Sequence, residues 1–141
     1  MNRVLSAIPH RPPFLFVDEI IEIRDDGITC RRTLRENESF YAGHYPGNPV
    51  TPGVLLCESV FQAAAIYLSG KLQAGGTPVL CRIENARFKN MVFPGDILTI
   101  EVVFVEKMQG FYFMSGKVIC NGKTALTIKF ALTVLEQTKT V

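Results

Sequence analysis

The sequence predicts an α+β fold, in which one long apolar helix is wrapped by a curved antiparallel sheet of about six strands. Three observations support this prediction. Residues 53–68 form a single apolar stretch of helical length. The segments around it are rich in β-branched and aromatic residues and are separated by turn signals. The length of 141 residues suits one domain spanning 1–141.

The N-terminal part predicts a short helix followed by a β-hairpin. Pro9 and the pair Pro12-Pro13 stop the helix, and Asp25-Asp26-Gly27 is a turn signal between the two strands. Residues 35–52 are rich in Pro and Gly and are expected to be irregular, as functional loops often are. The expected bounds are 2–8 for the helix, and Phe14–Ile23 and Ile28–Leu34 for the strands.

The apolar helix begins at Pro52-Gly53 and is expected to end near Gly70 or at Gly75-Gly76. Because it is apolar on all sides, it must be surrounded. One sheet covers one side, so the other side and the sheet edges are expected to need a second subunit. Asn121-Gly122 is a strong hairpin signal within the four strands that follow. These strands are expected at Val79–Phe88, Ile97–Lys107, Phe111–Cys120 and Thr124–Leu135.

Composition excludes several classes of function. A net charge of +2 is too small to indicate nucleic-acid binding. Four cysteines without a CxxC pair, and only two histidines, provide no metal-site spacing. The start of the chain lacks a signal-peptide pattern, and the apolar stretch is shorter than the ~20 residues of a membrane span. These features together predict a cytoplasmic protein with free thiols.

Glu58 is a carboxylate in the middle of the apolar helix, where an unpaired charge is costly. A buried carboxyl with a raised pKa is a candidate proton donor. Gln62 lies four residues later and shares its helix face, which is expected to look into a polar cleft. The alternative is a structural carboxylate that pairs with a core arginine or accepts hydrogen bonds from backbone donors.

His44 precedes the helix by nine residues, in a segment that prolines and glycines constrain. It is a candidate base, although a lone loop histidine is more often a packing or surface residue. The amides near Gly53, Val54 and Leu55 at the helix start are expected to stabilise a developing oxyanion. His10 is expected only to order the turn before the first strand.

The segment from Gly43 to Glu58 resembles the (3R)-hydroxyacyl-[acyl carrier protein] dehydratases of bacterial type II fatty-acid synthesis. It reads GHYPGNPVTPGVLLCE, similar to the family signature GHFPGxPVxPGVLxxE, and the helical glutamine follows as Gln62. Further similar stretches are 9–18, 86–88 and 94–96. The resemblance therefore covers nearly the whole chain.

This resemblance implies a hot-dog fold and a homodimer, three of which often associate as a hexamer. It implies that His44 of one subunit and Glu58 of the other form each site, with Gly53, Val54 and Gln62 binding substrate. The acyl chain would arrive on the phosphopantetheine of an acyl carrier protein, with no metal and no other cofactor. Arg82, Arg87 and Lys89 form a candidate patch for that acidic carrier.

The chain departs from the family at the wall of the acyl tunnel. Val79-Leu80 stand where the family often has a Tyr-Phe pair, whose tyrosine acts as the tunnel gate, and Thr51 stands where a Met or an aromatic residue is common. Phe88 or Phe93 is expected to serve as a substitute gate. These changes affect the expected acyl preference and leave the acid–base residues in place.

The expected reaction is dehydration of a (3R)-hydroxyacyl thioester to the trans-2-enoyl thioester. His44 removes the C2 proton, and Glu58 protonates the departing hydroxyl. Three alternatives remain: a hot-dog thioesterase, a non-catalytic subunit that binds acyl carrier protein, and a dehydratase-isomerase. The family resemblance for the isomerase has an aspartate in place of Glu58.

Overall fold

A computed structural model describes residues 3–44, 47–72 and 76–136. These residues form two α-helices, one 3₁₀ helix and six strands. The helices are α1 (Arg3–Ala7), η1 (Ser39–Ala42) and α2 (Gly53–Ser69). The strands are β1 (Glu19–Arg24), β2 (Gly27–Thr33), β3 (Gly76–Phe88), β4 (Ile97–Met108), β5 (Phe111–Cys120) and β6 (Lys123–Glu136).

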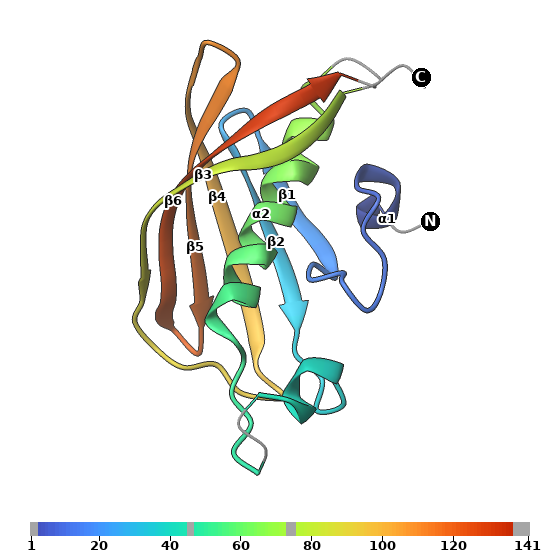
Figure 1. Ribbon diagram of the computed structural model, residues 1–141, viewed down its shortest axis with the longest axis vertical. Helices are drawn as coiled ribbons and strands as arrows, with labels where there is room; N and C mark the ends of the chain where they lie inside the picture. The colour runs from blue at the N-terminus through green and yellow to red at the C-terminus, as the bar shows by residue number, and fades with distance from the viewer. Residues whose placement is uncertain (1–2, 45–46, 73–75, 137–141) are drawn as a thin grey trace.

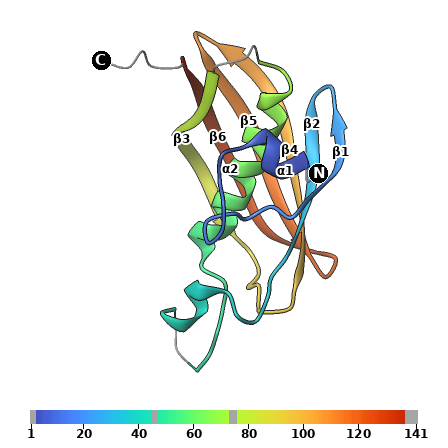
Figure 2. The same cartoon turned by 90° about the vertical axis from the view of Figure 1, so that its right-hand side faces the viewer.

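The six strands form one antiparallel sheet in the order β1-β2-β4-β5-β6-β3, which curves around α2 (Figure 1). Figure 2 shows α1 beside α2, near the end of the sheet that carries β1. The predicted fold class, a central helix wrapped by a six-stranded antiparallel sheet, is therefore confirmed. Among the described residues, no helix is long and apolar enough to cross a membrane.

Helix α2 forms the centre of the core because its sequence is apolar around nearly its whole circumference. The helix ends at Ser69 and is capped by Gly70, which is the first of the two ends that the sequence predicts. Apolar side chains of the inner face of the sheet pack against it. The buried residues with the largest side chains include Val60, Leu68, Ile28, Leu98, Ile100, Met114, Leu126, Ile128 and Phe130.

The Asn121-Gly122 hairpin forms as predicted. Cys120 pairs with Lys123, and the two turn residues have φ angles of 53° and 73°. Two consecutive positive φ values define the type I′ turn, whose twist matches that of the flanking strands. Glycine and asparagine adopt this conformation at low cost.

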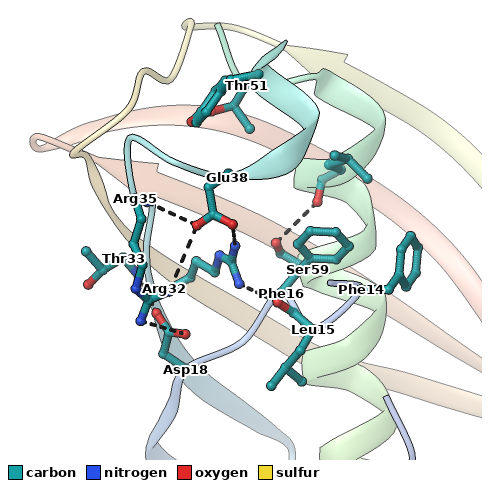
Figure 3. Close-up of polar contacts among 12 residues, drawn as sticks. Phe14, Leu15, Phe16, Asp18, Arg32, Thr33, Arg35, Glu38, Thr51 and Ser59 are labelled. Atoms are coloured by element: carbon teal, nitrogen blue, oxygen red, sulfur yellow. Dashed lines mark hydrogen bonds and ion pairs between the residues drawn. The ribbon is translucent and has the colours of Figure 1, made fainter. Parts of the chain in front are cut away.

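The prediction of a first strand over Phe14–Ile23 is wrong in its first half, because β1 begins only at Glu19. In residues 14–16, three peptide groups bond to side chains instead of a neighbouring strand. The Phe16 amide donates to Gln62, the Phe14 carbonyl accepts from Gln62, and the Leu15 carbonyl accepts from Arg32. Side chains from α2 and β2 therefore compete successfully for the backbone of residues 14–16, and Figure 3 shows the contact between Arg32 and the Leu15 carbonyl.

Candidate active site

His44 lies two residues after the end of η1, and it lines the same cavity as Gly53 at the N-terminal end of α2. Its amide donates to the Tyr41 carbonyl at 3.4 Å, and its ring Nδ1 lies 2.9 Å from the Val50 carbonyl. A carbonyl oxygen only accepts hydrogen bonds, so Nδ1 carries the hydrogen in this contact. In the neutral imidazole, Nε2 then holds the lone pair and can accept a proton.

A cavity of about 480 Å³ lies beside His44. Gly53, at the first position of α2, lines it together with residues of the β3–β4 connection. A Cβ atom at Gly53 would lie 2.7 Å from Cε1 of Phe88, so a glycine allows the helix start to approach this ring. The cavity is lined by His44, Val50, Thr51, Gly53, Leu56, Phe88, Lys89, Asn90, Met91 and Val92.

The first turn of α2 offers fewer free amides than the sequence predicts. The Leu55 amide donates to the Pro52 carbonyl at 3.0 Å, so the prediction that Leu55 contributes to an oxyanion site is wrong. Pro52 is the N-cap residue, and its carbonyl accepts this 3₁₀-type bond at the helix start. Gly53 and Val54 remain the candidate donors, at the positive end of the helix dipole.

Glu58 lies on α2, with its side chain 22% exposed. Burial raises the pKa of its carboxyl, while the hydrogen bond from Gln62 and the charge of His10 act in the opposite direction. A carboxyl with a raised pKa retains its proton to higher pH, as a proton donor near neutral pH requires. In place of the core arginine of the alternative reading, the Gln62 carboxamide contacts Glu58, at 3.1 Å.

Gln62 is buried, at 1% exposure, and its carboxamide makes three hydrogen bonds. Its Nε2 donates to Glu58 Oε2 and to the Phe14 carbonyl, and its Oε1 accepts from the Phe16 amide. These contacts hold the Glu58 carboxylate against the segment before β1. Gln62 therefore orients Glu58 in this structure, and the predicted contact with substrate stays a prediction.

His10 also lies beside Glu58, with 3.9 Å between its Nε2 and Glu58 Oε2. Sequence reasoning gave His10 only a local role in the turn. Arg11 does order that turn, because its guanidinium donates to the carbonyls of Leu5 and Ile8. The missed signal is the proline-rich run after His10, which brings the N-terminal segment back against α2.

His44 and Glu58 lie on different sides of α2. Leu56 and Gly53 line the His44 cavity, whereas Glu58 contacts His10 and Gln62. At about 100° per residue, Glu58 points about 140° away from Gly53 and about 160° away from Leu56. Within one chain the two proton-transfer candidates therefore face different spaces.

The predicted gate residues also separate. Phe88 lines the His44 cavity, while Phe93 lines a neighbouring cavity of about 320 Å³. Val79 and Leu80 pair with Thr133 and Leu132 of β6, near the opposite end of β3 from Phe88. In a single chain only Phe88 is placed at the cavity.

The predicted carrier patch is extended along β3. Lys89 lines the His44 cavity, and Arg87 is bonded to Asn85 at 3.1 Å. Arg82 pairs with Glu84 at 3.3 Å, and seven residues of strand place it up to about 23 Å from Lys89. Lys89 is therefore the member of the patch that lies at the cavity.

Two further predictions concern cysteines and metals. Cys57 is buried, at 7% exposure, and burial raises the pKa of its thiol, as expected for a packed side chain. All four cysteines are free. In the described part of the chain, no group of three metal-ligating side chains is close enough to hold an ion.

The curved antiparallel sheet around a central helix defines a hot-dog fold, and His44 and Glu58 are its candidate acid–base residues. A model of the FabA-like domain matches residues 8–129, and the chain belongs to this family. The 3-hydroxyacyl-[acyl-carrier-protein] dehydratase FabZ of Caldicellulosiruptor saccharolyticus is 39% identical over 138 residues, covering 92% of this chain and 98% of the relative. FabZ of Clostridium perfringens is 37% identical over 135 residues, covering 91% and 97%.

Solved structures support the fold. The dehydratase heterocomplex ApeI:P from Xenorhabdus doucetiae has a TM-score of 0.80 at 17% identity, covering 95% of this chain and 91% of that chain. The uncharacterised protein PH1136 from Pyrococcus horikoshii has a TM-score of 0.70 at 19% identity, covering 89% and 88%. At these identities the likeness concerns the fold alone.

Proposed function

We propose that this protein is a 3-hydroxyacyl-[acyl-carrier-protein] dehydratase, which converts the (3R)-hydroxyacyl form to the trans-2-enoyl form in fatty-acid synthesis. The observation that carries the proposal is the pair of oriented proton-transfer groups. His44 is held by the Val50 carbonyl, and Glu58 by Gln62. FabZ relatives named for this activity match more than nine-tenths of the chain.

In the proposed reaction, His44 Nε2 takes a proton from C2 of the substrate. The Gly53 and Val54 amides stabilise the negative charge that develops on the thioester oxygen. Glu58 gives its proton to the hydroxyl at C3, the C3–O bond breaks, and water leaves as the C2–C3 double bond forms. The thioester itself activates C2, so we propose no metal and no cofactor other than the carrier's phosphopantetheine.

We further propose that the enzyme is a homodimer with sites shared between subunits. Strand β3 is 13 residues long and forms one edge of the sheet. Leu80, Ile83 and Phe88 on this strand are 39%, 51% and 54% exposed. A long apolar edge is a template for pairing with a second strand. Pairing there places a partner next to the His44 cavity, which supports joining His44 of one subunit with Glu58 of the other.

Acyl carrier protein is the proposed partner, with Lys89 among the residues that line the cavity. The carrier is expected to be acidic, so a cation at this position favours its docking. Association of three dimers into a hexamer is a further part of the proposal. The free thiols support a reducing, cytoplasmic location.

The decisive experiment mixes two inactive variants, His44→Ala and Glu58→Gln. Each is expected to lower turnover of 3-hydroxyacyl carrier substrate about 100-fold or more. Random subunit exchange produces half mixed dimers, each with one intact site out of two, so about a quarter of wild-type activity should return. Confirmed exchange without any recovery contradicts a shared site. Release of free thiol in place of the enoyl product would identify a thioesterase instead.

A further inference from the structure

Tyr41 and Thr51 form a buried hydroxyl pair at the two ends of the segment that contains His44. Tyr41 Oη and Thr51 Oγ1 lie 2.6 Å apart, and ten positions separate the two residues in the chain. Each residue is only 6% exposed. This bond closes the segment into a loop with His44 inside it.

His44 makes one contact to Tyr41 of this pair and one to Val50, the residue next to Thr51. The His44 amide donates to the Tyr41 carbonyl, at 3.4 Å. Its Nδ1 donates to the carbonyl of Val50, at 2.9 Å, and that carbonyl belongs to the peptide bond that joins Val50 to Thr51. A change in the backbone at Thr51 therefore moves the Val50 carbonyl, which is the acceptor that holds the His44 ring.

Both ends of the loop are anchored to the rest of the fold. The Tyr41 amide donates to the Glu38 carbonyl at 3.2 Å, and the Glu38 carboxylate lies 2.9 Å from the buried guanidinium of Arg32 on β2 (Figure 3). On the other side, the Thr51 amide donates to the Val92 carbonyl at 2.8 Å. The hydroxyl pair connects these two anchors directly.

We propose that Tyr41 and Thr51 are positioning residues, which fix the Val50 carbonyl and thereby the orientation and tautomer of His44. This inference rests on the proposed role of His44 as the base. A hydrogen bond is directional, so it fixes the loop in a way that apolar packing of the same side chains does not. When the bond between Tyr41 and Thr51 is lost, the imidazole can carry its hydrogen on Nε2 instead of Nδ1. Nε2 then has no free lone pair and cannot accept a proton from the substrate.

The activity test compares Tyr41→Phe, Thr51→Val and the double variant. Each single change should lower kcat about tenfold, with KM within about twofold of wild type. The kcat of the double variant should be no lower than that of the less active single variant, because all three variants lose the same hydrogen bond. Thr51→Ser keeps the Oγ atom and should retain wild-type kcat.

Tyr67→Phe is the matched control. The Tyr67 hydroxyl also makes a hydrogen bond, partly buried, to the Asp25 carbonyl, but near the C-terminal end of α2. It should destabilise the protein without lowering kcat per folded enzyme. A loss of kcat equal to that of Tyr41→Phe would attribute the effect to general destabilisation and overturn the proposal.

A second readout follows His44 directly, by long-range ¹H–¹⁵N NMR of the imidazole nitrogens. The chain has two histidines, so a spectrum of His10→Gln assigns the signals. Wild type should show the Nδ1–H tautomer, and both Tyr41→Phe and Thr51→Val a mixture. An unchanged tautomer in the folded variants overturns the proposal, as do additive losses of kcat. If wild type shows no dehydratase activity, the proposed function fails, and the tautomer comparison still decides whether the pair positions His44.

Discussion

Gly116 on β5 sets how closely helix α2 can approach the sheet, and Gly116→Ala is expected to disturb both stability and catalysis. Gly116 is buried and lies opposite Val102 and Ile128 on the neighbouring strands. An added Cβ atom would lie 2.3 Å from Val60 Cγ1, and 3.3 Å from Ile128 Cγ2 and Phe130 Cε1. Only the contact with Val60 is severe.

The displacement can be worked from these distances. Carbon atoms pack best at about 3.5–4.0 Å, so Val60 must move away by about 1.2–1.7 Å. A β-branched side chain in a helix has one strongly preferred rotamer, so the movement falls on α2 itself. Such overpacking typically costs about 1–3 kcal/mol of the free energy of unfolding. Glu58 lies two residues from Val60, and a shift of about 1 Å at a reacting group can lower kcat about 100-fold.

Urea unfolding and turnover assays test this expectation in a double-mutant cycle with Val60→Ala. Val60→Ala removes the clashing methyl. The double variant should therefore be less destabilised than the sum of the two single variants, by at least about 1 kcal/mol in the free energy of unfolding. It should also recover part of the lost kcat. Gly70→Ala is the control, because Gly70 has φ −82° and, among the described residues, an added Cβ atom would meet only the Tyr67 carbonyl oxygen, at 3.7 Å. Wild-type stability and kcat in Gly116→Ala would refute the reasoning.

Three further predictions concern the site. Because burial raises the pKa of Glu58 above its ordinary 4.5, its contribution to stability is present at low pH and is lost as pH rises through the raised pKa. Glu58→Gln should therefore raise Tm at pH 8 relative to wild type but not at pH 4, and an equal effect at both pH values would contradict this. Lys89→Glu should raise KM for carrier-bound substrate and reduce its salt dependence, with little change for a short thioester mimic; equal losses on both substrates would point to damage at the cavity itself. Val79→Tyr should alter the relative rates for short and long acyl chains, by about 1–3 kcal/mol per discriminated methylene, in a competition assay; an unchanged profile removes Val79 from the tunnel wall.

Much of the fold was predictable because it depends on local and periodic signals. The continuous apolar run predicted α2 to within a residue or two, and Asn121-Gly122 predicted its hairpin. The family and the dehydratase class, predicted from the Gly43–Glu58 signature, are confirmed by the family match and the FabZ relatives. Glu58 could be selected because a carboxylate is unusual in such a helix.

The remaining features depend on contacts between distant residues, which no local pattern reports. Residues 14–16 have the composition of a strand, yet their peptide groups bond to Gln62 and Arg32 from other elements. The ion pair between buried Arg32 and partly buried Glu38 looks like ordinary surface charge in the sequence. The neighbourhood of His10 and Glu58 likewise arises only when α1 and its connection fold back on α2.

Because Gly53 and Glu58 lie on different sides of the same helix, a dimer of the proposed kind would use each α2 in both of its sites. One site would receive the helix N-terminal amides, and the other would receive the carboxyl group. A rigid helix moves as a unit, so a ligand that shifts α2 on filling one site would also change the geometry of the second. The two sites would then communicate through a single shared element, and binding of a tight substrate analogue would depart from simple independent saturation.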